Sequence, residues 1–171
     1  MKHLLGAASA ALFLVCAPSA MAAQASASVT ATAIVITPLT ESVTTNLNFG
    51  KLVMNASNSA GTLAVAAATG TRSVTGGVDL VGGTSGTAAV VHVVGDTVNG
   101  APNPYDVTID STTTLTDSGT DTMSVTAIGS SDTLIGITGA NDIHIGATLH
   151  AAANQAPSTY SGSFSVTAAY E

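Results

Sequence analysis

Alternation of bulky or apolar residues with small or polar ones, at a period of two, dominates the C-terminal part of the chain. In residues 143–150, isoleucine, alanine and leucine alternate with histidine, glycine and threonine. A second alternating register then places six residues on one face: Tyr160, Gly162, Phe164, Val166, Ala168 and Tyr170. A period of two over this length predicts β-strands with one buried and one exposed face. We expect the two strands to form a terminal hairpin around the turn at residues 154–157.

The same alternation covers residues 25–36, where alanine and valine occupy the odd positions and serine, threonine and finally isoleucine the even ones. This pattern predicts one long strand, ended by Thr37 and Pro38 and roughly twice as long as a usual strand. Between the two ends, further short strands are separated by turns rich in glycine, asparagine and aspartate, and no helical period is convincing. The expected strands cover residues 44–50, 62–67, 72–81, 88–94, 105–110 and 122–128. Eight to ten such strands predict an all-β fold, an antiparallel Ig-like or pilin-like β-sandwich.

The first 22 residues have the features of a secretory signal peptide. Lys2 gives a positive start, residues 4–16 form an apolar run too short to span a bilayer, and Ala20-Met21-Ala22 is a small-x-small cleavage site. Residues 23–171 then form a single β-sandwich domain. We expect the protein to be exported to the periplasm, the cell surface or the extracellular medium.

Charge and cysteine content restrict the partners and the means of stabilisation. Cys16 is the only cysteine, so the exported chain has no disulfide. After the signal peptide, Lys51 and Arg72 are the only Lys and Arg residues, against ten carboxylates. So few cations argue against binding to nucleic acid or to anionic membrane surfaces. No later stretch is long and apolar enough for a transmembrane helix.

Several motifs resemble a Gram-negative family of secreted domains of unknown function, family 4402. The most specific match is the stretch Ile145–Leu149 with Ala153–Ala156 and Tyr160–Phe164. Weaker matches are the Leu47-Asn48-Phe49-Gly50 motif, two glycine pairs, and Tyr105-Asp106-Val107. The resemblance covers essentially all of the exported chain. It implies an exported β-sandwich and no catalytic residues.

The two ends of the chain are also loosely similar to chaperone–usher pilus subunits and to spore-coat-protein-U-like domains. Pilins carry an alternating N-terminal extension and end in an alternating strand with a penultimate tyrosine, here Tyr170. The likeness implies strand donation, in which the N-terminal strand of one copy fills a groove in the next. The chain lacks the pilin cysteine pair, and no glycine is clearly placed early in the terminal strand.

Candidate residues for this assembly lie at both ends of the chain. The donor candidates share one strand face: Ala27, Val29, Ala31, Ala33 and Val35. The candidates for the core or for the acceptor groove also share a face: Tyr160, Phe164, Val166 and Tyr170. The alternative is that the first strand pairs within its own sandwich. Possible partners are therefore copies of the chain itself and a periplasmic chaperone.

No residue pattern predicts catalysis, a cofactor or a metal site. His92, His144 and His150 are expected to face outward from strands, and their spacing does not suit one metal ion. Asp117 and Asp121 do not match a calcium loop, and we expect their side chains to cap their own backbone. A calcium site formed by another cluster of loop residues is left as an alternative. No Gly-x-Ser-x-Gly motif occurs.

The sequence therefore predicts a non-enzymatic exported structural or surface protein, with a pilin-like subunit as the leading hypothesis. The alternative is a monomeric secreted or periplasmic binding module. In that case loops such as residues 99–104 or 111–120 would contact an unidentified ligand.

Overall fold

The computed structural model describes residues 24–97 and 102–171. The predicted signal peptide, residues 1–22, and the first part of the predicted loop at residues 99–104 lie outside the described residues. The chain divides into two compact units, residues 1–34 and 35–171.

The described residues form strands and no helix, and every strand pair is antiparallel, which confirms the all-β prediction. Within these residues, accordingly, no helix could cross a bilayer. The strands are β1 (Thr40–Thr45), β2 (Leu52–Met54), β3 (Gly61–Val65), β4 (Arg72–Gly76), β5 (Val78–Leu80), β6 (Ala89–Val94), β7 (Tyr105–Ile109), β8 (Thr113–Thr116), β9 (Thr122–Ser130), β10 (Ala140–Ala151) and β11 (Val166–Tyr170).

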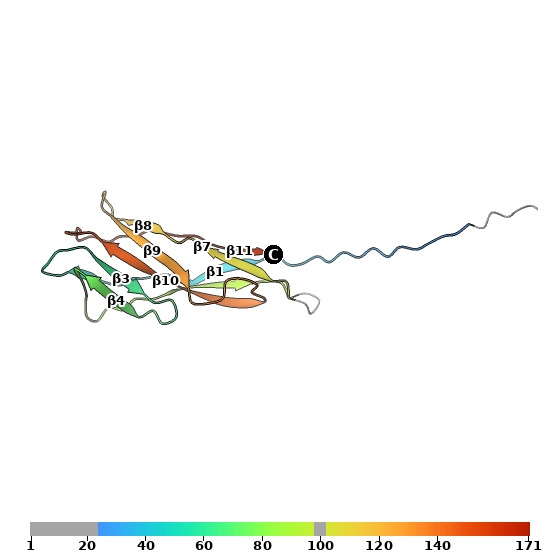
Figure 1. The fold of residues 1–171 in the computed structure, drawn as a ribbon, viewed down its shortest axis with the longest axis horizontal. Coiled ribbons are helices and arrows are strands. Elements are labelled where there is room, and N and C mark those ends of the chain that lie inside the picture. The colour runs from blue at the N-terminus through green and yellow to red at the C-terminus, as the bar shows by residue number, and fades with distance from the viewer. Residues whose placement is uncertain (1–23, 98–101) are drawn as a thin grey trace, which may run out of the picture. The chain divides into compact units, whose positions relative to one another are not determined.

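The long strand β10 is the centre of the largest sheet. Its first half pairs with β6, and its second half pairs with both β3 and β9 (Figure 1). Outer strands β1, β4 and β8 pair with β6, β3 and β9 respectively. The predicted alternation is confirmed here, because Ile143, Ile145, Ala147 and Leu149 are buried. The even-numbered histidines and threonine of the same strand are half-buried on the opposite face.

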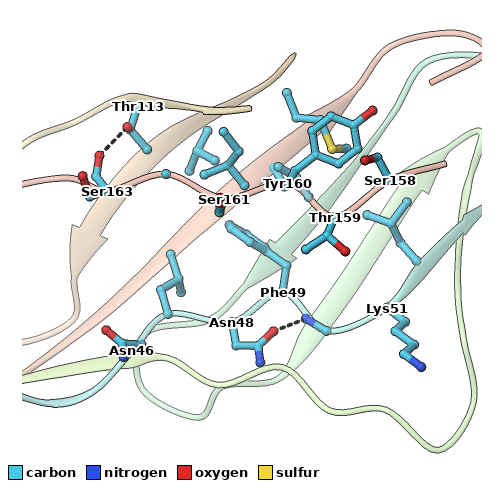
Figure 2. Close-up of a pocket in the computed structure, with 18 of the residues that line it drawn as sticks. Asn46, Asn48, Phe49, Lys51, Thr113, Ser158, Thr159, Tyr160, Ser161 and Ser163 are labelled. Carbon is cyan, nitrogen blue, oxygen red and sulfur yellow. Dashed lines mark hydrogen bonds between the residues drawn. The ribbon is translucent and has the colours of Figure 1, made fainter. Parts of the chain in front are cut away.

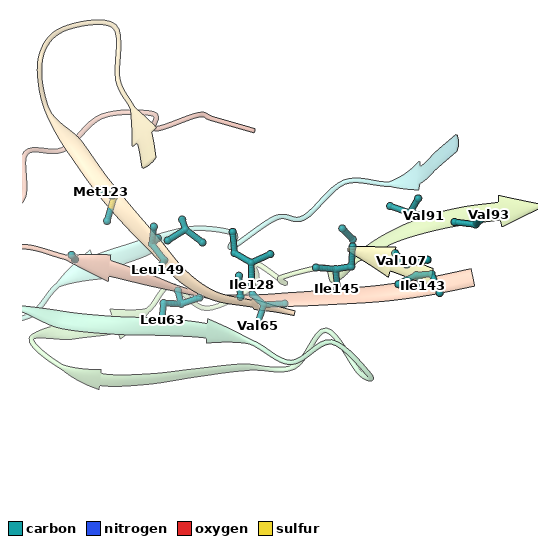
Figure 3. Close-up of a cluster of buried hydrophobic side chains, with 14 of the residues drawn as sticks. Leu63, Val65, Val91, Val93, Val107, Met123, Ile128, Ile143, Ile145 and Leu149 are labelled. Atoms are coloured by element: carbon teal, nitrogen blue, oxygen red, sulfur yellow. The ribbon is translucent and has the colours of Figure 1, made fainter. Parts of the chain in front are cut away.

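A second layer, the two-stranded sheet of β7 and β11, covers part of this core. Tyr105 and Val107 of β7 are buried in one cluster with Val91 and Val93 of β6 and Ile143 of β10. Figure 3 shows the cluster continuing along β10 to Leu63, Met123 and Leu149. The fold is therefore a β-sandwich whose layers share one core, as the sequence predicts.

The predicted terminal hairpin is wrong. β10 pairs with β3, β6 and β9, whereas β11 lies in the other sheet and pairs with β7. Strand structure also begins only at Val166, and residues 157–165 form no continuous ladder. The face assignment holds for five of the six residues, since Tyr160, Phe164, Val166, Ala168 and Tyr170 are half-buried and the residues predicted on the opposite face are exposed. Gly162, predicted on the same face as these five, is exposed.

The long strand predicted over residues 25–36 is not formed. Residues 24–39 take part in no strand or bridge, and residues 24–38 are exposed, with Val29 92% and Val35 87% exposed. A strand needs a hydrogen-bonding partner, and no edge of the domain supplies one to this segment. The hypothesis that it pairs within its own sandwich therefore finds no support in this structure.

Candidate functional site

A large groove lies in the domain formed by residues 35–171, with a volume of about 1610 Å³. One wall consists of β1 and residues 46–54, and the other of residues 154–166. Core residues form the floor: Ala89, Val91, Met123, Val125 and Leu149. Figure 2 shows the two walls, with the side chain of Phe49 lying between them.

The first wall is shaped by a tight turn in the Leu47-Asn48-Phe49-Gly50 motif. The Oδ1 atom of Asn48 accepts a hydrogen bond of 2.7 Å from the amide of Gly50 (Figure 2), and Gly50 has a φ of 71°. Such a left-handed conformation favours glycine. The strand predicted over residues 44–50 is therefore wrong for its second half, because β1 ends at Thr45 and residues 47–50 form a turn. Asn48 also exchanges two backbone hydrogen bonds with Thr87. The turn thereby fixes the position of Phe49 at the groove.

Arg72 on β4 holds this turn from behind. Its guanidinium donates to the carbonyl oxygens of Phe49 at 3.2 Å and Lys51 at 3.1 Å, and also to the carbonyl oxygen of Thr84. Arginine suits this role because its planar group can direct several donors at once and always carries a charge. In the sequence Arg72 is notable only for its charge, and no local pattern predicts this contact.

The second wall has one paired edge and one open edge. Ser161 exchanges backbone hydrogen bonds with Thr116, and the carbonyl oxygen of Ser165 accepts a hydrogen bond from the amide of Asp110. The carbonyl oxygen of Ser163 accepts one from the hydroxyl of Thr113 (Figure 2). The odd-numbered residues therefore direct their backbone groups away from the groove. In an extended chain, the even-numbered residues direct theirs to the other side, toward β1. No strand of the described residues pairs with that edge.

Two links between the walls close one end of the groove. Glu41 on β1 accepts a hydrogen bond of 2.6 Å through Oε1 from the amide of Ala168 on β11. Beside it, the hydroxyl of Tyr170 donates to the carbonyl oxygen of Thr37 at 2.9 Å. Both links use a side chain, so β1 and β11 do not form a ladder with each other.

The second link is part of a larger contact, here named the terminal clasp: Thr37, Asp96, Asn103 and Tyr170. Asp96 is fully buried, and its carboxylate accepts hydrogen bonds from the amide and hydroxyl of Thr37 and from the amide side chain of Asn103. The amide of Asp96 donates to the hydroxyl of Tyr170 at 2.7 Å. The clasp fixes the first residues of the folded domain to its last strand.

The candidate residues from the sequence fall into three groups. Tyr160, Phe164 and Val166, the candidates for the core or for the acceptor groove, line the groove. Tyr170 does not line it and belongs to the clasp. The donor candidates are unpaired and exposed: Ala27, Val29, Ala31, Ala33 and Val35.

The three histidines face away from the core, as predicted. His92 contacts Asp142 at 2.6 Å, His144 contacts Asp132 at 3.1 Å, and the Nε2 atom of His150 lies 2.7 Å from the hydroxyl of Thr126. Among residues 24–97 and 102–171, no three histidine, cysteine or acidic side chains are grouped as they would be around a metal ion.

The carboxyl group of Asp132 has a shifted pKa. Partial burial raises the pKa of its carboxyl group. Hydrogen bonds from the amide and imidazole of His144 and from Ser130 outweigh burial, so the pKa lies below its usual value. The contact ties the segment after β9 to β10.

The loop at residues 117–121 caps its own backbone, which confirms the prediction for Asp117. Its Oδ1 atom accepts hydrogen bonds from the amides of Gly119 at 2.8 Å and Asp121 at 3.2 Å. The carboxylate is thereby used within the turn.

Comparison with known proteins gives one family match. The model of a family described as a domain of unknown function (DUF4402) matches residues 39–170. Searches of the curated proteins and of the solved structures gave no match.

Proposed function

The chain belongs to the DUF4402 family of domains of unknown function, and on this premise we propose that it is a non-enzymatic, exported structural protein that assembles by strand donation. The groove of one copy accepts the N-terminal segment of another, with Ala27, Val29, Ala31, Ala33 and Val35 directed toward the core. Assembly takes place at the surface of a Gram-negative cell, and the protein is a pilin-like subunit.

The groove is the observation that carries this proposal. Its floor is apolar; on one side lies the edge strand β1, which pairs only with β6, and on the other lie residues 157–165, which belong to no strand. Val43 and Val53, which line it, are 63% and 49% exposed. Open edges and uncovered apolar residues are unfavourable in a finished sandwich and are normally covered. An added strand would supply both hydrogen-bonding partners and apolar contacts.

The N-terminal segment has the properties of such a strand. Residues 25–36 contain no charged residue and alternate at a period of two. The nine residues 27–35 span about 30 Å when extended, the same length as the nine residues 158–166 of the groove wall. Their small side chains suit a groove whose floor is formed by side chains already packed in the core.

Affinity in this mode comes from main-chain hydrogen bonds, and specificity comes from alternate side chains that enter the groove. A periplasmic chaperone that offers a similar strand would protect the groove before assembly. Neither step needs a cofactor, a metal or a disulfide.

Introduction of one negative charge on either face of the donor segment tests the proposal. Val29→Asp places a carboxylate on the face that enters the groove, and Ser28→Asp places one on the opposite face as a matched control. Size-exclusion chromatography with light scattering should show oligomers for the native chain and for Ser28→Asp. It should show only monomer for Val29→Asp and for a chain that begins at Thr37.

A native chain that stays monomeric over the accessible concentration range would contradict the proposal and favour a monomeric binding module. Equal assembly of the two aspartate variants would also contradict it, because burial of the odd face would then contribute nothing.

A further inference from the structure

We propose that Glu41 is a stop that closes one end of the groove and so fixes the direction and the register of the donated strand. This inference rests on the proposed strand donation. It assigns a role to a residue outside both sets of assembly candidates.

Glu41 is the only carboxylate among the described residues that line the groove. Its Oε1 atom lies 2.6 Å from the amide nitrogen of Ala168, so a charge-assisted hydrogen bond joins the two walls. The lining of the groove ends at the same place, because Val166 is its last residue on β11. The bond therefore occupies the position that a further residue of an added strand would need.

The bond also shows which backbone groups face the groove. Ala168 is even-numbered, and its amide points across the gap toward β1. The amides and carbonyls of residues 160, 162, 164 and 166 share this orientation, since their odd-numbered neighbours bond to the other side. With the amide of Ala168 taken by Glu41, Val166 is the last residue of the wall that can pair with a donor.

The stop determines the direction of the donor strand. Away from Glu41, the amide of Asn154 donates a hydrogen bond of 3.1 Å to the carbonyl oxygen of Asn58, in the turns that follow β10 and β2. Between these two links, no hydrogen bond of the described residues joins residues 42–54 to residues 155–166. The C-terminal end of the donor must leave the groove to reach its own domain at Thr37. It therefore lies at the end away from Glu41, and the donor runs antiparallel to residues 158–166.

The length match then sets the register. With the nine donor residues placed on the nine wall residues, Ala27 lies opposite Val166, Val29 opposite Phe164 and Ala31 opposite Gly162. In this register two alanines of the donor face Val166 and Gly162, and the larger Val29 faces Phe164. At Gly162, an added Cβ atom would lie 2.5 Å from the carbonyl oxygen of Thr114 and 3.0 Å from a side-chain carbon of Leu115, so the approach of β8 keeps this wall position small.

Disulfide trapping tests the direction and the register, because the exported chain contains no native cysteine. In this register Ser28 lies opposite Ser165, and Thr32 lies opposite Ser161. Both are positions without mutual backbone hydrogen bonds, where opposed side chains are closest. One chain carries a single donor cysteine and a second chain a single wall cysteine, and the mixture is oxidised. Covalent heterodimers should form for the pairs 28–165 and 32–161 and should be at least about tenfold fewer for 28–161 and 32–165.

The role of Glu41 is tested by Glu41→Ala in the acceptor chain. Without the stop the donor can slide by two residues, so the pair 28–167 should now trap at the expense of 28–165. Glu41→Gln keeps an oxygen that can accept the bond from Ala168, and its pattern should match that of the native acceptor. Thermal unfolding of each acceptor checks that the domain remains folded.

The outcomes separate the two proposals. Preferential trapping of 28–161 and 32–165 would overturn the inferred direction, and an unchanged pattern in Glu41→Ala would overturn the role of Glu41. In both cases strand donation itself would stand. If no pair traps in the native acceptor, strand donation fails and the role of Glu41 fails with it.

Discussion

The hydroxyl of Tyr170 is the most direct place to test the terminal clasp, because one atom joins three parts of the domain. It accepts a hydrogen bond from the amide of Asp96 at 2.7 Å and donates one to the carbonyl oxygen of Thr37 at 2.9 Å. Tyr170→Phe removes both bonds and leaves the ring in place. The variant thus measures the clasp with little change in packing.

The size of the effect follows from these two bonds. Each contributes about 1 kcal/mol, and an amide left unpaired at a buried residue such as Asp96 costs about 1–3 kcal/mol. We expect the free energy of unfolding to fall by about 2–4 kcal/mol in total. For a domain of this size the melting temperature should fall by about 5–12 °C.

The measurement is urea unfolding followed by circular dichroism, with every variant made in the Val29→Asp background so that assembly does not contribute. Thr167→Val is the control, since it removes an exposed hydroxyl from the same strand and should change stability by less than about 0.5 kcal/mol. A Tyr170→Phe variant as stable as this control would refute the clasp as a source of stability.

Three further variants test other parts of the domain. Gly146→Ala should lower stability by about 2–3 kcal/mol in urea unfolding, because its Cβ atom would overlap the backbone of residues 65–67; a neutral effect would contradict this close approach. Arg72→Lys should lower stability by about 2 kcal/mol or more by the same assay, since an ammonium group cannot reach all the carbonyls that the guanidinium holds. Asp132 stabilises the fold above the unfolded-state pKa of about 3.9, and this contribution is lost as the pH falls through its lowered folded-state pKa. The stability difference between the native chain and Asp132→Asn should therefore shrink in acid, and a constant difference would argue against the contact with His144.

The sequence predicts the faces of strands better than their partners. The alternation in residues 143–150 and 160–170 correctly identifies the residues that turn toward the core, because the two faces of a strand differ in solvent exposure. It does not show that β10 pairs with β3, β6 and β9 while β11 pairs with β7. A short loop between two alternating segments suggests a hairpin, but the chain here crosses from one layer to the other.

Parts of the groove could not be found from local patterns. β1 has no alternation in exposure, since all six of its residues are exposed beside the open groove. Glu41 bonds to Ala168, 127 positions further along the chain. Asp96 bonds to Tyr170, 74 positions further along. A lone carboxylate gives no sign of such contacts in the sequence. The grouping of Tyr160, Phe164 and Val166 on one face was the only signal of the groove, and it did not distinguish a groove from a core.

An open groove raises the question of why the two edges do not simply pair with each other. Direct pairing would bring β1 and β11 to about 4.8 Å and cover the floor. Glu41 opposes this, because its side chain takes the place of a backbone partner at Ala168 and holds the edges apart. An inward charge on an edge strand is a known means of preventing unwanted pairing. The rim adds serine, threonine and asparagine side chains, which keep the empty groove hydrated. A domain built in this way resists closure on itself, which is what the proposed strand donation requires of the acceptor.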